Sequence, residues 1–169
     1  MRFYHFTALE YLPSILDEGL TRGDVPLGPR KFDNAVWLTR NADPAAQACW
    51  AGEERLLTDE ERRAHESLYG YPVPPGSRFA DKRAVLLAVE IPEDDPKLIA
   101  WRSLAKRSGA NPKWLRTLRS SPDWFIYRGT VPTDWIVEIA GLSEQAQATI
   151  AEFHASGGRL NQKHQPPAE

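Results

Sequence analysis

The chain has 169 residues, a length that fits one domain with a buried core and falls short of the size at which chains usually divide. Hydrophobic residues make up 41% and charged residues 26%, which are ordinary values for a globular protein. The formal net charge of −2 excludes a global field that would draw the chain onto nucleic acid or an anionic membrane, so any contact with a polyanion has to be local.

The cysteine and histidine content limits disulfides and metal sites. Cys49 is the only cysteine, which excludes an intramolecular disulfide, and the four histidines are too far apart for metal-ligand spacing. The N-terminus lacks the features of a signal peptide, and no stretch approaches the roughly 18 apolar residues of a membrane helix. We therefore expect a cytoplasmic protein without membrane contact, acting as a monomer and requiring no metal.

The first elements in chain order are a strand and a helix. Residues 2–6 alternate polar and aromatic side chains, which predicts a short strand, and the apolar spacing over residues 9–16 predicts a helix. Pro13 is tolerated in the first turn, so we expect this helix to begin near Leu12 and to end at Gly19. Residues 24–34 predict a loop that could cover a ligand, and Ala35–Thr39 predicts a second strand.

Two surface helices and a central strand follow. Asp43 as cap and Pro44 as first residue predict a short helix to about residue 50, and Thr58 begins a second, highly charged one. After a proline-rich loop at 69–77, the longest apolar run predicts a central strand within residues 83–91.

The last third predicts three more strands and a final helix. The strands are expected at 97–101, Trp124–Arg128 and 135–140, and a broken helical stretch at 104–118. Ser143 is expected to cap a helix to about Ala155. Because helices and strands do not alternate strictly, the sequence favours an α+β fold, with residues 1–156 as one domain and 157–169 as a flexible tail.

The most informative segment is Tyr4-His5-Phe6-Thr7, followed by a helix with the run Leu-Pro-Ser-Ile-Leu at 12–16. This pattern predicts a rigid polar surface that could bind a ligand. The surface would consist of a histidine at a strand end and a hydroxyl two residues later, with a helix packed behind them. This segment resembles the first motif of the ADP-ribosyltransferase superfamily, especially the DarT-type toxins that modify DNA. The resemblance continues at Val36-Trp37-Leu38-Thr39 and at residues 122–127 and 131–136, which are similar to the second motif strand and the late strands of that family.

The resemblance implies an NAD-dependent ADP-ribosyltransferase with split, mainly antiparallel β-sheets around an NAD cleft and helices packed outside. NAD would be a consumed substrate. His5 would orient a ribose hydroxyl, because neutral imidazole offers one donor and one acceptor, and Trp37 would stack on nicotinamide. Asp123 would stand for the catalytic glutamate and stabilise the positive charge that develops on the ribose. The residues expected to bind NAD are His5, Thr7, Trp37, Thr39 and Arg83.

Each of these candidates also has a structural interpretation. His5 can be a hydrogen-bonded structural residue, Trp37 a core residue, and Asp123 a turn residue after Pro122. Glu138 is a fallback carboxylate, although it alternates with apolar neighbours like a solvent-facing strand residue.

A basic and aromatic segment at 101–121 is the only local feature suited to nucleic acid. Its cations could neutralise phosphates while Trp101 or Trp114 stacks on a base, or the segment could be a solvated helix that balances the acidic residues of 53–66. The expected target-binding residues are Arg102, Lys106, Arg107, Lys113, Arg116 and Arg119.

The leading interpretation is a toxin or a phage or defence effector that transfers ADP-ribose to nucleic acid or protein. A second is a relative of the KptA-type RNA 2′-phosphotransferases, which share that fold and also use NAD. A third is a catalytically inactive module that binds a nucleotide or a partner in the same cleft. Asp123 favours the third, because aspartate is one methylene shorter than glutamate.

Overall fold

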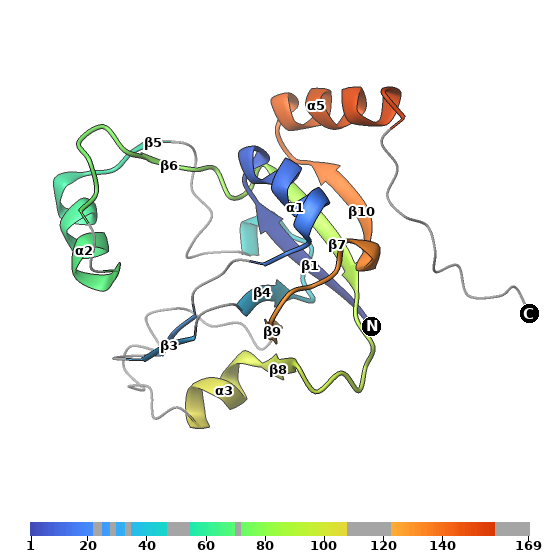
Figure 1. Cartoon of the computed structure of the whole chain (residues 1–169), viewed down its shortest axis with the longest axis horizontal. Helices are drawn as coiled ribbons and strands as arrows, with labels where there is room; N and C mark the ends of the chain where they lie inside the picture. The colour runs from blue at the N-terminus through green and yellow to red at the C-terminus, as the bar shows by residue number, and fades with distance from the viewer. Residues whose placement is uncertain are drawn as a thin grey trace, which may run out of the picture.

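A six-stranded antiparallel sheet forms the centre of the protein, with strand order β10-β7-β1-β4-β9-β8 (Figure 1). The computed structural model describes residues 1–21, 25–27, 30–32, 35–46, 55–69, 72–107 and 123–157. In sheet order the strands are Ile136–Gly141, Val85–Glu90, Arg2–Thr7, Ala35–Thr39, Trp124–Arg128 and Leu98–Ala100. The mixture of helices with an antiparallel sheet agrees with the expected α+β class.

The sheet has a narrow junction between β1 and β4. β1 pairs with β7 along its whole length, from Arg2 opposite Glu90 to Thr7 opposite Val85. β1 pairs with β4 at only one position, where Tyr4 lies opposite Thr39. The sheet therefore consists of two three-stranded halves joined through one residue pair.

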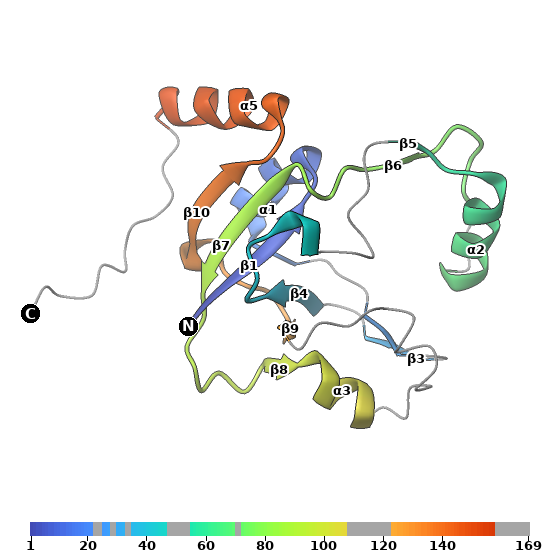
Figure 2. The same cartoon turned by 180° about the vertical axis from the view of Figure 1, so that it is seen from behind.

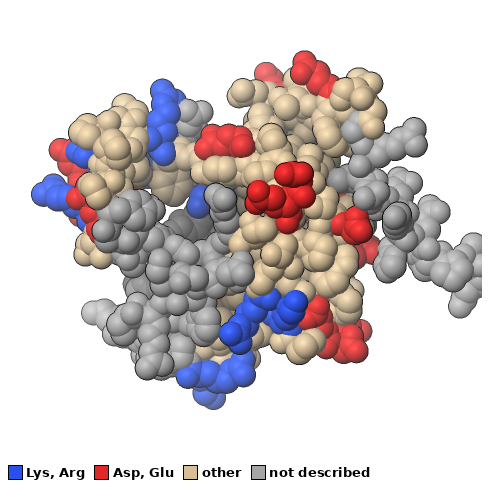
Figure 3. Space-filling view, viewed as in Figure 1, with Lys and Arg blue, Asp and Glu red and all other residues tan. Residues whose placement is uncertain are grey.

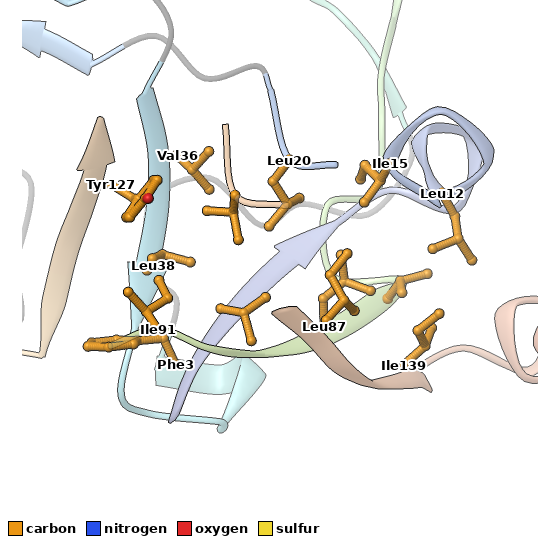
Figure 4. Packing of buried hydrophobic residues seen from close by; sticks show 14 of the residues in the cluster. Phe3, Leu12, Ile15, Leu20, Val36, Leu38, Leu87, Ile91, Tyr127 and Ile139 are labelled. Carbon is orange, nitrogen blue, oxygen red and sulfur yellow. The ribbon is translucent and has the colours of Figure 1, made fainter. Parts of the chain in front are cut away.

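One face of the sheet carries the larger hydrophobic core. Leu12 and Ile15 point from α1 (Leu12–Glu18) toward Leu87 and Ile139 of the sheet, as Figure 4 shows. The helix α5 (Glu144–Ala155) adds Ile150 to the same cluster. Burial on this face fixes the register of β1, β7 and β10, because a slip of one residue would turn these apolar side chains to the other face.

A second, aromatic cluster lies beneath α3 (Trp101–Arg107), at the end of the sheet opposite to α5 (Figure 2). β4 contributes to both clusters, because alternate residues of a strand point to opposite faces. Val36 belongs to the first cluster, whereas Ala35 and Trp37 pack in the second. The buried members of the second cluster are Ala35, Trp101, Leu104, Ala105, Trp124 and Ile126.

Several element boundaries confirm the sequence predictions. α1 begins at Leu12 with proline in its first turn and ends before Gly19. The Ser143 hydroxyl accepts a hydrogen bond from the Ala146 backbone N–H at 3.2 Å and caps α5. α2 (Asp59–Tyr69) begins with a reciprocal capping box, since Thr58 and Glu61 each accept from the other's backbone N–H.

Other predictions were wrong. Residues expected to form a loop contain the hairpin of β2 (Val25–Leu27) and β3 (Arg30–Phe32), and β5 (Arg55–Leu56) pairs with β6 (Arg78–Phe79) in an unexpected ribbon. These strands are too short to produce a periodic signal. The helix expected after Asp43 is a 3-10 turn at Pro44–Ala46 in the described part, and α3 begins at Trp101 instead of residue 104. The expected tail beyond residue 157 lies outside the described residues.

Among the described helices, none combines the length and the apolar character needed to cross a membrane.

Gly19 is expected to tolerate substitution worse than any exposed glycine. Its φ of 82° is left-handed, and a Cβ there would overlap the Val131 carbonyl oxygen. That oxygen accepts the Leu20 backbone N–H at 2.9 Å and cannot move freely. We expect Gly19→Ala to lower the free energy of unfolding by at least about 2 kcal/mol in urea titrations.

Gly76→Ala is the matched control. Gly76 has a similar φ of 84° but no atom within 4 Å of the added Cβ, so only the backbone penalty of about 1 kcal/mol remains. Equal losses for the two variants would contradict the role given to the contact with Val131.

Candidate functional site

His5 lies at the junction of the two half-sheets, immediately after the Tyr4–Thr39 pair. Its Nδ1 is 2.8 Å from the backbone carbonyl oxygen of Trp37. A carbonyl only accepts hydrogen bonds, so Nδ1 carries a proton and donates it. The imidazole thus bridges β1 and β4 where their backbone ladder stops. In the neutral ring Nε2 has a lone pair, and no described residue hydrogen-bonds to it.

The ring is neutral near pH 7. Burial lowers the pKa of His5 below its ordinary value of 6.5, and this is the largest effect. The hydrogen bond to the Trp37 carbonyl raises the pKa, and the positive charge of Lys82 lowers it. Nε2 is therefore an acceptor at neutral pH and can accept a hydrogen bond from a ligand hydroxyl.

The lowered pKa predicts a loss of stability in acid. The unfolded chain binds a proton at His5 near pH 6.5, whereas the folded chain binds it only at a lower pH. Between these two values the unfolded state carries more protons, so the free energy of unfolding falls as the pH falls. Above that window His5 contributes no pH dependence, and below it the loss is constant.

The measurement compares wild type with His5→Asn in urea titrations at about pH 7.5 and about pH 5.5. We expect wild type to lose more stability on acidification than the variant, because the variant lacks the titrating ring. An equal loss in both proteins would contradict a lowered pKa at His5.

The two candidate threonines differ in what their hydroxyls do. Thr7 follows His5 on the same side of β1, is 4% exposed, and its hydroxyl has no hydrogen-bond partner in the described part of the chain. Thr39 is 3% exposed, and its Oγ1 accepts the Asn41 backbone N–H at 3.1 Å. Thr39 thus stabilises the turn after β4, while the Thr7 hydroxyl remains available.

Trp37 contributes its backbone to the His5 site and its ring to the aromatic cluster. The ring centroid lies 4.8 Å from that of Trp101 and 5.7 Å from that of Trp124. The side chain remains partly exposed. Any stacking on a ligand is therefore confined to the part of the indole that the two other tryptophans leave uncovered.

Asp123 lies at the start of β9, and β4 separates it from β1. Its carbonyl oxygen accepts the Arg40 backbone N–H at 3.0 Å. Because neighbouring strands lie about 4.8 Å apart, the Asp123 and His5 backbones are separated by roughly 10 Å across the sheet. Glu138, the fallback carboxylate, is exposed and lies 3.6 Å from Arg2 in an ion pair, as expected for a solvent-facing residue.

The turn before β7 contains two basic residues and leads into the strand that pairs with the end of β1. The Asp81 carboxylate accepts the Arg83 backbone N–H at 2.8 Å, and Val85 then pairs with Thr7. Arg83 was an expected ligand-binding residue, whereas Lys82, whose positive charge helps to lower the pKa of His5, was not. The available signal was the position of Lys82, directly before the strand expected to be central.

The basic segment is only partly described. Arg102, Lys106 and Arg107 are exposed on α3, and Lys and Arg side chains gather in the region of α3 and β8 in Figure 3. Trp101 is fully buried, so its indole cannot stack on a base in this arrangement. Lys113, Arg116 and Arg119 lie outside the described residues.

The candidate site therefore comprises an acceptor nitrogen and a threonine hydroxyl on β1, with a lysine in the turn that leads into the neighbouring strand β7. This set suits a ligand that carries both a hydroxyl and an anionic group. Within the described ranges, no cluster of histidine, cysteine and acidic side chains could hold a metal ion. No protein-family model, curated protein or solved structure gives a significant match to this chain.

Proposed function

We propose that this protein is an NAD-dependent ADP-ribosyltransferase in which NAD is a consumed substrate. The observation that carries the proposal is the 2.8 Å hydrogen bond between His5 Nδ1 and the Trp37 carbonyl oxygen. It fixes the tautomer and orientation of the ring, and it leaves Nε2 to accept a hydrogen bond from a ribose hydroxyl. A ligand group held in one orientation reacts faster because less freedom has to be lost at the transition state.

The narrow β1–β4 junction supports the same proposal. With Tyr4 and Thr39 as the only pair in their register, the two half-sheets can diverge beyond His5. An NAD cleft between two half-sheets is the arrangement that the resemblance to ADP-ribosyltransferases implies.

In the proposed reaction the bond between ribose C1′ and the nicotinamide nitrogen breaks, and its electron pair leaves with nicotinamide. The nucleophile of the acceptor then bonds to C1′ and loses its proton. Positive charge develops on the ribose in the transition state, where a carboxylate stabilises it more than in the ground state. Asp123 is the proposed carboxylate.

A second candidate function is a nucleotide-binding module without catalysis. The specific observation in its favour is the position of Asp123, which lies two strands from His5 and has a shorter side chain than glutamate. Such a module would keep the His5 contact and hold the ligand without cleaving it.

The test uses NAD labelled separately in its nicotinamide and adenylate groups. The protein is incubated with mixed pools of protein, DNA and RNA, and both labels are traced. Release of nicotinamide with transfer of adenylate label to a macromolecule supports the transferase, and the labelled pool identifies the acceptor class. Binding without release supports the module, and neither binding nor release overturns both candidates.

A further inference from the structure

Lys82 has an unusual environment for a lysine. Its side chain is partly buried in the turn before β7, and its Nζ lies 5.8 Å from the centroid of the Phe79 ring. In the part of the chain that the structure describes, no carboxylate or carbonyl pairs with this ammonium. Burial also lowers its pKa. Lysine ammonium groups are strongly hydrated, so removing water from one without an anionic partner costs free energy.

The nearby acidic groups are already engaged elsewhere. Asp81 accepts the Arg83 backbone N–H through Oδ1 at 2.8 Å. Glu61 forms a two-pronged ion pair with Arg55, whose guanidinium lies 5.5 Å from the same Phe79 ring. The described surroundings of Lys82 thus hold a second cation over the same ring and no acidic group paired with the Lys82 ammonium.

Lys82 and His5 offer complementary groups to a ligand, an ammonium donor and an acceptor nitrogen. The positive charge of Lys82 contributes to the lowered pKa of His5, although burial is the larger cause. The backbone also connects the two residues. The turn that carries Lys82 leads into Val85, and Val85 pairs with Thr7, which lies two residues after His5. An ammonium donor and an uncharged acceptor nitrogen together complement a phosphate attached to a sugar that bears a free hydroxyl.

We propose that Lys82 binds a phosphate group of the ligand whose ribose hydroxyl contacts His5. The site is therefore selective for phosphorylated ribose, such as the diphosphate-linked ribose of a dinucleotide, over an uncharged nucleoside. This inference rests on the proposed function for the identity of the ligand. Lys82 acts as a binding residue and not as a nucleophile, so no covalent step involves it.

The experiment compares the binding of ADP-ribose and of adenosine by calorimetry. Because a charge-assisted hydrogen bond is lost, we expect Lys82→Gln to weaken ADP-ribose binding by about ten- to a hundredfold. Adenosine binding should not change, and Lys82→Arg should retain most of the affinity for ADP-ribose. Equal weakening of both ligands, or no weakening of either, would overturn the proposal.

Lys97→Gln is the matched control. Lys97 is exposed and lies 5.9 Å from the Tyr127 ring centroid, so it shares the aromatic contact of Lys82 without its burial. The Lys97→Gln variant should bind ADP-ribose with the same affinity as wild type. Urea titrations of all variants confirm that each is folded.

A second readout separates this inference from the proposed function. Inorganic pyrophosphate is titrated while NMR follows the protonation of His5. A bound anion favours the imidazolium, so pyrophosphate should raise the pKa of His5 in wild type and leave it unchanged in Lys82→Gln. This result would support the phosphate site even if NAD is never cleaved. If NAD is cleaved but pyrophosphate leaves the pKa of His5 unchanged in wild type, the Lys82 proposal fails and the transferase stands.

Discussion

His5→Asn is expected to reduce nicotinamide release from NAD by at least about 100-fold, because the ribose loses the group that orients it. The fold should survive. The asparagine amide nitrogen occupies nearly the same place as Nδ1 and can still donate to the Trp37 carbonyl oxygen. Only the acceptor at Nε2 is lost. The measurement is the initial rate of nicotinamide release, with the free energy of unfolding measured on the same preparations.

Two further variants serve as comparisons for His5→Asn. His5→Gln loses the bond to Trp37, and we expect it to lose stability as well as activity. His154→Asn replaces an exposed histidine on α5 and should keep the wild-type rate. Full activity in His5→Asn would contradict a role for Nε2, and the site would then have to use a different acceptor.

Strands and helices with a clear local signal were predictable from the sequence. Pro13 and Gly19 marked both ends of α1, and Ser143 marked the start of α5. The apolar run of β7 correctly indicated a buried strand in the larger core. These features depend on capping, backbone restriction and hydrophobic periodicity, which are encoded within a few residues.

The geometry of the candidate site depends on strand pairing, which local sequence does not encode. Nothing in Arg2–Thr7 indicates that β1 pairs fully with β7 but meets β4 at only one pair. The direction of the Trp37 ring was also hidden, because β4 is apolar on both faces and gives no alternating pattern. The separation of Asp123 from His5 follows from the position of β4 between their strands.

The electrostatic environment of Lys82 also depends on strand pairing and could not be predicted from the local sequence. A lysine in a charged turn normally indicates a solvated surface residue. Its partial burial and its effect on His5 arise only after β7 has paired with β1. The sequence therefore offered His5 as a candidate residue but gave no signal for the partial burial of Lys82.

The largest expected effect on stability is at Trp101. This side chain is fully buried and packs against Trp37 with ring centroids 4.8 Å apart. We expect Trp101→Ala to lower the free energy of unfolding by about 3–5 kcal/mol in urea titrations, since it removes an indole from the smaller core and leaves a cavity. Loss of this packing should also shift the tryptophan fluorescence to longer wavelength, because Trp37 becomes more exposed to water.

Trp101→Phe tests whether the loss comes from packing or from a polar contact. The Trp101 Nε1 is buried and has no hydrogen-bond partner among the described residues, so phenylalanine removes volume without breaking such a bond there. We expect a loss of about 1–2 kcal/mol. As a control, Leu56→Ala alters a side chain that is 59% exposed and should change stability by less than about 0.5 kcal/mol. If Trp101→Ala cost no more than Leu56→Ala, the aromatic cluster would not belong to the cooperative core, and the β4–β9–β8 half-sheet would unfold separately from the half that carries His5.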